Sequence, residues 1–154
     1  MKRYLLLITI LLAILTGCES TKLSTAEVNS LQTKVESHSF TADFNYCQPL
    51  RMPARTLTSE YSVVLSSDTL QSSLPYIGQV RNVPYGGGTA LNFKEKIRSV
   101  SDKRVKGDWR TISVVVNHEG DNVIYDFHIF DNGKVMLDVT SRERDFISFQ
   151  GQIR

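Results

Sequence analysis

The sequence predicts a mainly β domain, either an antiparallel sandwich or a curved-sheet, barrel-like domain of about seven or eight strands, with one N-terminal amphipathic helix. Two observations lead to this prediction. From Phe40 onward, apolar residues recur at every second position, and turn signals separate these runs at short intervals. Alternation with a period of two places one face of a strand in the core. Short hairpin connections between successive runs favour antiparallel pairing.

The predicted helix begins at a capping box. Ser24-Thr25-Ala26-Glu27 has the spacing in which a Ser or Thr and a Glu three residues later satisfy the first backbone amides of a helix. Val28, Leu31 and Val35 then recur at helical spacing through about Ser37. We expect this narrow apolar stripe to pack on the sheet; the alternative is a helix that binds a partner.

The predicted strands are defined by residues that share an inward face. In chain order these sets are Phe40, Ala42, Phe44 and Tyr46; Tyr61, Val63 and Leu65; Leu70 and Leu74; Leu91, Phe93 and Ile97; Ile112, Val114 and Val116; Tyr125, Phe127 and Ile129; Val135, Leu137 and Val139; and Ile147, Phe149 and Ile153. We expect turns at Ser67-Asp68, Lys106-Gly107-Asp108, Glu119-Gly120-Asp121-Asn122 and Asp131-Asn132-Gly133, the last of which supplies the Asn-Gly pair typical of hairpins. Gly151 indicates a bulge or a sharply curved strand.

The N-terminus has the composition of a secretion signal. Lys2 and Arg3 precede an apolar run from Tyr4 to Leu15, which is shorter than the roughly 20 residues that a spanning helix needs. The following tetrapeptide, Leu15-Thr16-Gly17-Cys18, resembles the lipobox of bacterial lipoproteins. That resemblance implies cleavage before Cys18 and lipidation of this cysteine with acyl chains such as palmitate.

This interpretation divides the chain into three parts and predicts its location in the cell. Residues 1–17 are the expected signal peptide, 18–23 a lipidated tether, and 24–154 a single β-rich domain. Several acyl chains give stable anchoring. We therefore expect a membrane-bound lipoprotein of the cell envelope on the periplasmic or outer side, with the outer membrane favoured because most envelope lipoproteins of diderm bacteria reside there.

The charge of the mature chain argues against a nucleic-acid partner. The full chain has 18 basic and 16 acidic residues, so that losing Lys2 and Arg3 leaves 16 of each. Nucleic-acid binding requires clustered Lys and Arg to displace counterions from phosphates. The short basic run at Lys103, Arg104 and Lys106 is flanked by acidic residues and is typical of a solvated hairpin end.

One segment, from Leu74 to Gly88, does not have the pattern of a strand or a turn. It is long, aromatic and rich in glycine, and loops of this kind in compact domains are often functional. The candidate binding residues are Tyr76, Arg81, Tyr85 and Gly86. The alternative is an ordered loop that covers a sheet edge, with prolines blocking strand pairing.

The sequence contains no recognisable catalytic or metal-binding motif. His38, His118 and His128 are widely spaced, and we expect neither a metal nor a cofactor. Asp126 and His128 share a strand face and could form part of a base or a ligand pair, although solvent-facing strand residues are the simpler interpretation. With Cys18 lipidated, Cys47 remains single, and its strand setting predicts a buried small residue. We expect that this protein is not an enzyme.

Several motifs together resemble a known family. They are Leu74-Pro75-Tyr76 with Gly78, Pro84-Tyr85-Gly86, Phe93, Phe130-Asp131-Asn132-Gly133, and Ile147-Ser148-Phe149 with Gly151 and Ile153. In this combination, and over nearly the whole mature chain, the sequence is similar to the family called domain of unknown function 4251. The resemblance implies a small lipoprotein of Bacteroidota and carries no assigned activity. The charged run Arg142-Glu143-Arg144-Asp145 is a less usual feature with no role implied by the resemblance.

These observations leave three hypotheses for function. The first is a non-catalytic binding or interaction module that uses the Tyr76 to Tyr85 loop against an envelope protein or a glycan. The second is a carrier of an apolar ligand, held in a cavity under a curved sheet, which is an analogy of architecture alone. The third is a hydrolase that uses Asp126 and His128.

Overall fold

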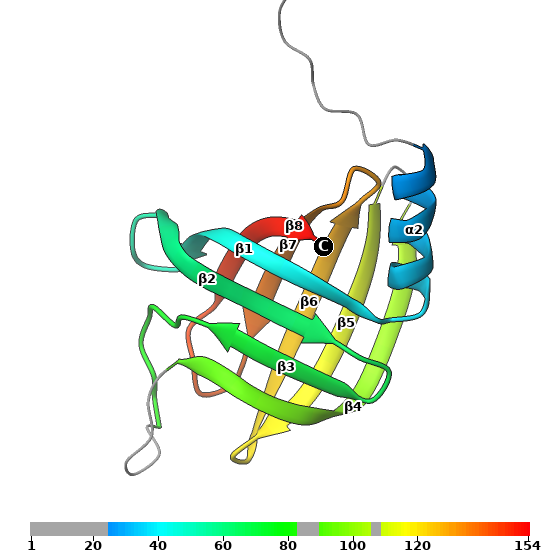
Figure 1. The fold of residues 1–154 in the computed structure, drawn as a ribbon. Helices are drawn as coiled ribbons and strands as arrows, with labels where there is room; N and C mark the ends of the chain where they lie inside the picture. Colours follow the sequence, from blue (N-terminus) through cyan, green and yellow to red (C-terminus); the bar gives the residue numbers. More distant parts are fainter. Residues whose placement is uncertain (1–24, 83–89, 106–108) are drawn as a thin grey trace, which may run out of the picture.

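The chain folds into one closed antiparallel β-barrel with a short helix beside it (Figure 1). The computed structural model describes residues 25–82, 90–105 and 109–154. The strands are ordered in space as in the sequence, and β1 closes the barrel by pairing with β8. Of the predicted alternatives, the barrel is therefore the observed one.

The elements follow the predicted order. They are α2 (Thr25–Glu36), β1 (Phe40–Pro49), β2 (Arg55–Leu65), β3 (Thr69–Leu74), β4 (Leu91–Val105), β5 (Trp109–His118), β6 (Asp121–Phe130), β7 (Lys134–Thr140) and β8 (Ile147–Ile153). The expected turn at residues 106–108 lies outside the described residues, as do the predicted signal peptide and Cys18. Within the described residues, no helix is long and apolar enough to cross a membrane.

An up-and-down barrel has two ends, and we name them by what they carry. The helix end carries α2, the β2–β3 and β6–β7 turns and the C-terminus, as Figure 1 shows. The loop end carries the β1–β2, β3–β4 and β7–β8 loops and the tight β5–β6 turn. Successive antiparallel strands place these connections alternately at the two ends.

The predicted inward faces fill the barrel with side chains, except at Tyr46: the register shift between Phe44 and Tyr46 leaves Tyr46 half-buried, and Cys47 is buried in the core instead. Phe127, Leu137 and Phe149 are fully buried, and the apolar core extends continuously through all eight strands to Val35 of α2. Phe40 packs edge-on against Phe127, with ring centroids 5.5 Å apart. An eight-stranded barrel has an interior just wide enough for side chains to fill. The barrel interior is therefore a packed core.

Two hairpin turns have different geometries. The two-residue turn at Glu119 and Gly120 has positive φ at both positions, which is the type I′ pattern that suits the twist of paired strands. At the β6–β7 turn the predicted reversal is confirmed, but of Asn132 and Gly133 only the glycine has a positive φ, of 79°. The turn spans three residues, and its Gly133 amide donates to the Phe130 carbonyl at 2.9 Å.

Candidate functional site

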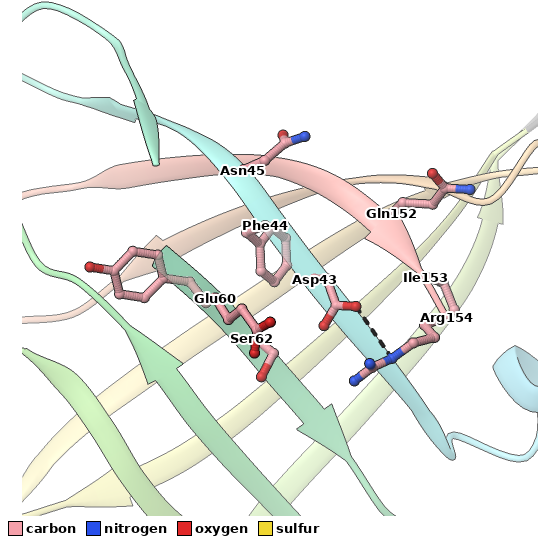
Figure 2. A pocket seen from close by; sticks show the side chains of 9 residues that line it. Asp43, Phe44, Asn45, Glu60, Ser62, Gln152, Ile153 and Arg154 are labelled. Carbon is pink, nitrogen blue, oxygen red and sulfur yellow. Dashed lines mark ion pairs between the residues drawn. The ribbon is translucent and has the colours of Figure 1, made fainter. Parts of the chain in front are cut away.

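A groove lies in the barrel wall where β1, β2 and β8 adjoin. Side chains of β1, β2 and β8 surround it, and it has a volume of about 640 Å³. Figure 2 shows the labelled side chains around Phe44, which forms part of its floor and is 3% exposed. The lining residues are Asp43, Phe44, Asn45, Glu60, Tyr61, Ser62, Gln152, Ile153 and Arg154.

An irregular pairing of β1 with β2 opens this groove. Phe44 pairs with Tyr61, but Tyr46 pairs with Thr56, so the four residues 57–60 of β2 face the single residue Asn45. A bulge of this kind bends the strand and interrupts the ladder of backbone hydrogen bonds. Alternation of inward and outward residues is lost there, which is why the sequence pattern located the strand only from Tyr61 onward.

On its other side β1 lies very close to β8, and this close approach of the two backbones requires a glycine at position 151. Gly151 lies opposite Phe44, beside the same bulge. A Cβ atom on Gly151 would lie 1.9 Å from the backbone oxygen of Asp43. The bulge or curvature predicted at Gly151 is therefore confirmed, and the glycine lets β8 approach the strand that forms the groove.

The groove combines hydrogen-bonding groups of several kinds. Asn45 and Gln152 supply amides, Asp43 and Glu60 supply carboxylates, and Ser62 supplies a hydroxyl. Arg154 Nε forms an ion pair with Asp43 Oδ2 at 3.3 Å (Figure 2), with both side chains partly exposed. Amides both donate and accept hydrogen bonds, whereas carboxylates accept. The set suits a polar ligand with several hydroxyl groups.

The predicted binding loop lies at the loop end, and only part of it can be placed. Tyr76 and Arg81 belong to the described residues, whereas Tyr85 and Gly86 lie outside them. The Tyr76 hydroxyl donates to the carbonyl oxygens of Gln79 at 2.9 Å and Asp145 at 3.1 Å. Burial raises the pKa of this hydroxyl. Tyr76 thus holds the loop against the β7–β8 loop, and binding by this loop stays a prediction.

Arg81 joins the same two loops. Its backbone amide donates to the Glu143 carbonyl at 2.8 Å, and its guanidinium donates to the Arg142 carbonyl at 2.6 Å. The Asp145 amide in turn donates to the Gln79 carbonyl at 3.1 Å. These bonds fasten the chain from Gln79 to Arg81 along the β7–β8 loop.

Two buried charged residues of the β7–β8 loop connect this loop to other segments at the loop end. Arg144 Nη1 lies 3.2 Å from Asp121 Oδ2, at the start of β6, and each side chain is 7% exposed. Asp145 Oδ2 lies 3.2 Å from Arg51 Nε of the β1–β2 loop. Burial of charges is costly unless they are paired. The charged run that the sequence left without a role therefore unites the four connections of the loop end.

Asp126 and His128 lie on the outer wall of the barrel, as the alternation predicted. His128 Nε2 is 3.4 Å from Asp138 Oδ2, and the Thr111 hydroxyl is 3.3 Å from His128 Nδ1. These are cross-strand pairs of neighbouring strands on a convex surface. Asp126 faces Asp138 in the adjacent strand. Catalysis by these residues stays a hypothesis.

The other two histidines lie apart from this pair. His38 Nε2 contacts Asp102 Oδ2 at 3.0 Å near the end of α2, and His118 Nδ1 contacts Glu95 Oε1 at 2.9 Å. His118 also stacks on Phe93, with ring centroids 4.1 Å apart. Across the residues that the structure describes, no three His, Cys, Asp or Glu side chains are grouped so as to hold a metal ion.

Three polar side chains in the barrel core add no site. Cys47 is fully buried, as predicted, and burial raises the pKa of its thiol. Burial also raises the pKa of the Tyr125 hydroxyl, and the nearby Ser72 hydroxyl offsets part of this increase. Neither hydroxyl has a hydrogen-bond partner of good geometry among the described residues.

Comparison with known proteins agrees with the motifs of the sequence. None of the curated proteins matches the chain. Among solved structures, the crystal structure of a DUF4251 family protein from Bacteroides eggerthii DSM 20697 is similar, with a TM-score of 0.63 and 9% sequence identity. The likeness covers 83% of this chain and 87% of that chain, and at this identity it shows a shared fold. The model of the family described as domain of unknown function (DUF4251) matches residues 22–153, and the chain belongs to that family.

Proposed function

We propose that this protein is a non-catalytic binding protein of the cell envelope, anchored through lipid on Cys18, whose ligand lies in the groove between β1, β2 and β8. The observation that carries the proposal is the groove itself. Its volume of about 640 Å³ falls within the range of roughly 300 to 1,000 Å³ found for small-molecule sites. The lipobox-like tetrapeptide ending at Cys18 supports the lipid anchor.

The packing of the barrel supports this site over the interior cavity of the carrier hypothesis. Carriage inside the barrel needs a space between the helix and the sheet, or between opposite walls. Instead Phe40 of β1 packs edge-on against Phe127 of β6, two strands that are not neighbours in the sheet, within one continuous apolar core. Opening that core to admit an apolar ligand would cost the packing that stabilises the barrel.

The lining of the groove supports a neutral, hydroxyl-rich ligand, such as a short oligosaccharide. Amides and carboxylates of Asn45, Gln152 and Glu60 offer planar pairs of hydrogen-bonding atoms. The Tyr61 ring supplies an amphipathic face against which a sugar ring can pack. Arg154 forms an ion pair with Asp43, so the charged lining side chains of Asp43, Glu60 and Arg154 sum to a single negative charge and the groove does not require a ligand of high charge.

The test is a binding measurement on the lipidated protein in detergent, against a panel of neutral hexose and N-acetylhexosamine oligosaccharides. Saturation-transfer NMR would detect weak binders, and titration calorimetry would give affinities. We expect Asn45→Ala and Gln152→Ala each to weaken binding about five- to tenfold, because each removes hydrogen bonds worth about 1 kcal/mol.

A matched control uses a polar residue on the opposite wall. Asn122 is exposed and lies on β6, outside the groove, so Asn122→Ala should leave the affinity unchanged. If no oligosaccharide bound, or if the groove variants bound like Asn122→Ala, the proposed ligand site would be wrong.

A further inference from the structure

The loop end exposes a small apolar surface that the groove does not use. Leu50 is 58% exposed, Met52 44% and Phe146 36%, although each is a large apolar residue. The Leu50 amide donates to the Phe146 carbonyl at 3.1 Å, which continues the pairing of Pro49 with Ile147 by one step. Residues directly opposite each other in such a ladder project from the same side. Leu50 and Phe146 therefore lie next to each other.

Two arginine side chains lie close to these apolar residues, because both approach Asp145, the chain neighbour of Phe146. Arg51 stands between Leu50 and Met52 in the chain and is 61% exposed, and Arg81 is 64% exposed. Arg51 Nε and Arg81 Nη2 approach the same carboxylate, that of Asp145, at 3.2 and 4.0 Å. Because two guanidinium groups share one carboxylate, the surface has an excess of positive charge.

The described basic residues at the loop end are arginines rather than lysines. Four arginines and no lysine occur in the described parts of the loop-end connections, which are residues 50–54, 75–82, 119–120 and 141–146. The arginines are Arg51, Arg81, Arg142 and Arg144. Protein interfaces are enriched in Met, aromatic residues and Arg, and are depleted in Lys. Arginine combines a charge with a planar face that packs on apolar groups.

We propose that Leu50, Met52, Phe146, Arg51 and Arg81 form a docking patch for a protein partner, which presents apolar side chains flanked by Asp or Glu. The apolar groups would be buried at the centre, and the two arginines would pair with the carboxylates at the rim. Complementary charge at the rim mainly sets the rate of association and the choice of partner, whereas burial at the centre supplies affinity.

The position of the patch favours a protein over the membrane. Helix α2, through which the chain leads back to Cys18, lies at the helix end, opposite the patch (Figure 1). With the proposed lipid anchor, the loop end would therefore point away from the anchoring bilayer. Three apolar side chains also bury less area than the amphipathic segments that bind membranes by insertion.

The experiment uses the full-length protein in its own cells, with a photo-crosslinking phenylalanine derivative in place of Met52. The matched control carries the same crosslinker in place of Val100, which is 38% exposed on β4, far from the loop-end connections in the topology. The adduct is digested, and mass spectrometry identifies the crosslinked segment. We expect a single protein from position 52, attached through an apolar segment that contains Asp or Glu, and no such adduct from position 100.

Variants then test whether the patch chemistry produces the adduct. Phe146→Ser and Leu50→Asp should reduce its yield about tenfold, as expected when a buried interface residue is lost. Arg51→Glu should reduce it comparably, whereas Arg51→Lys should retain more of it because the charge remains. Val100→Asp should have no effect.

Thermal unfolding of each variant separates loss of docking from loss of folding. Adducts with lipid only, the same adducts from positions 52 and 100, or a yield insensitive to both Phe146→Ser and Arg51→Glu would overturn the proposal. These outcomes are independent of ligand binding in the groove, because the groove and the patch share no residue.

Discussion

Arg144 and Asp121 form a buried ion pair between the β7–β8 loop and the first residue of β6, with 3.2 Å between Nη1 and Oδ2. A second bond strengthens the connection, because the Arg142 amide donates to Asp121 Oδ1 at 3.3 Å. Arg144 also lies over the Tyr76 ring, 5.9 Å from its centroid. The pair therefore connects three segments of the loop end that are distant in the sequence.

Removing one member of this pair should destabilise the barrel strongly. Arg144→Ala leaves the Asp121 carboxylate buried without its counter-charge, which typically costs about 3–5 kcal/mol. Replacing both, as Arg144→Met with Asp121→Leu, should cost clearly less than the two single changes combined, since no isolated charge remains. Urea unfolding of the wild type, Arg144→Met, Asp121→Leu and the double variant gives the coupling energy. Additive effects of the two changes would contradict the pairing.

Gly151→Ala should destabilise the barrel and distort the groove. The added methyl group would meet the Asp43 backbone oxygen at 1.9 Å, and neither strand can relieve a backbone contact by rotating a side chain. We expect a loss of about 2–4 kcal/mol, because over-packing forces backbone shifts.

Gly120→Ala is the matched control for this prediction. Gly120 has a positive φ of 87°, but a Cβ there would meet nothing within 4 Å, so the substitution carries only conformational strain. That strain costs about 1 kcal/mol. Equal losses for the two glycines in chemical denaturation would show that the β1–β8 contact is not the cause.

The strands could be predicted from the sequence because alternation is local, whereas closure of the barrel could not. Closure depends on pairing Asp43 with Gln152, across more than a hundred residues, and a sandwich has the same alternating pattern. The groove escaped prediction because residues 57–60 lack the alternation that marks a strand, and their unpaired position opposite Asn45 depends on the register of β1 with β2. The charged run at Arg142 to Asp145 was visible, but its partners Arg51 and Asp121 are distant in the chain.

Protonation of Asp102 in acid should make the protein less stable. Arg110 donates to both oxygens of Asp102, His38 contacts it as well, and these bonds lower the pKa of Asp102 below its ordinary value of 3.8. A carboxyl group whose pKa is lower in the folded state than in the unfolded state stabilises the fold above the unfolded pKa. This contribution is lost as the pH falls through the lower, folded-state pKa.

The corresponding measurement is the melting temperature of the wild type and of Asp102→Asn from neutral pH down to about pH 3. We expect the wild type to be more stable at neutral pH, with the difference shrinking below about pH 4 as the wild-type carboxylate takes up a proton. Asp68→Asn, at an exposed carboxylate of the β2–β3 turn, serves as the control. A difference that is constant across this range would exclude the proposed origin.

Cys47 should react with thiol reagents only when the barrel opens. Its side chain is fully buried on the inner face of β1, and burial raises the pKa of the thiol, which lowers the fraction of reactive thiolate. If Cys18 carries lipid as proposed, an aromatic disulfide reagent that titrates free thiols should therefore find no fast-reacting group in the native protein and one group after denaturation. Ser67→Cys, at an exposed turn position, provides a fast-reacting reference. Reaction of Cys47 at the rate of that reference would mean that the β1 wall opens far more readily than its packing against β8 implies.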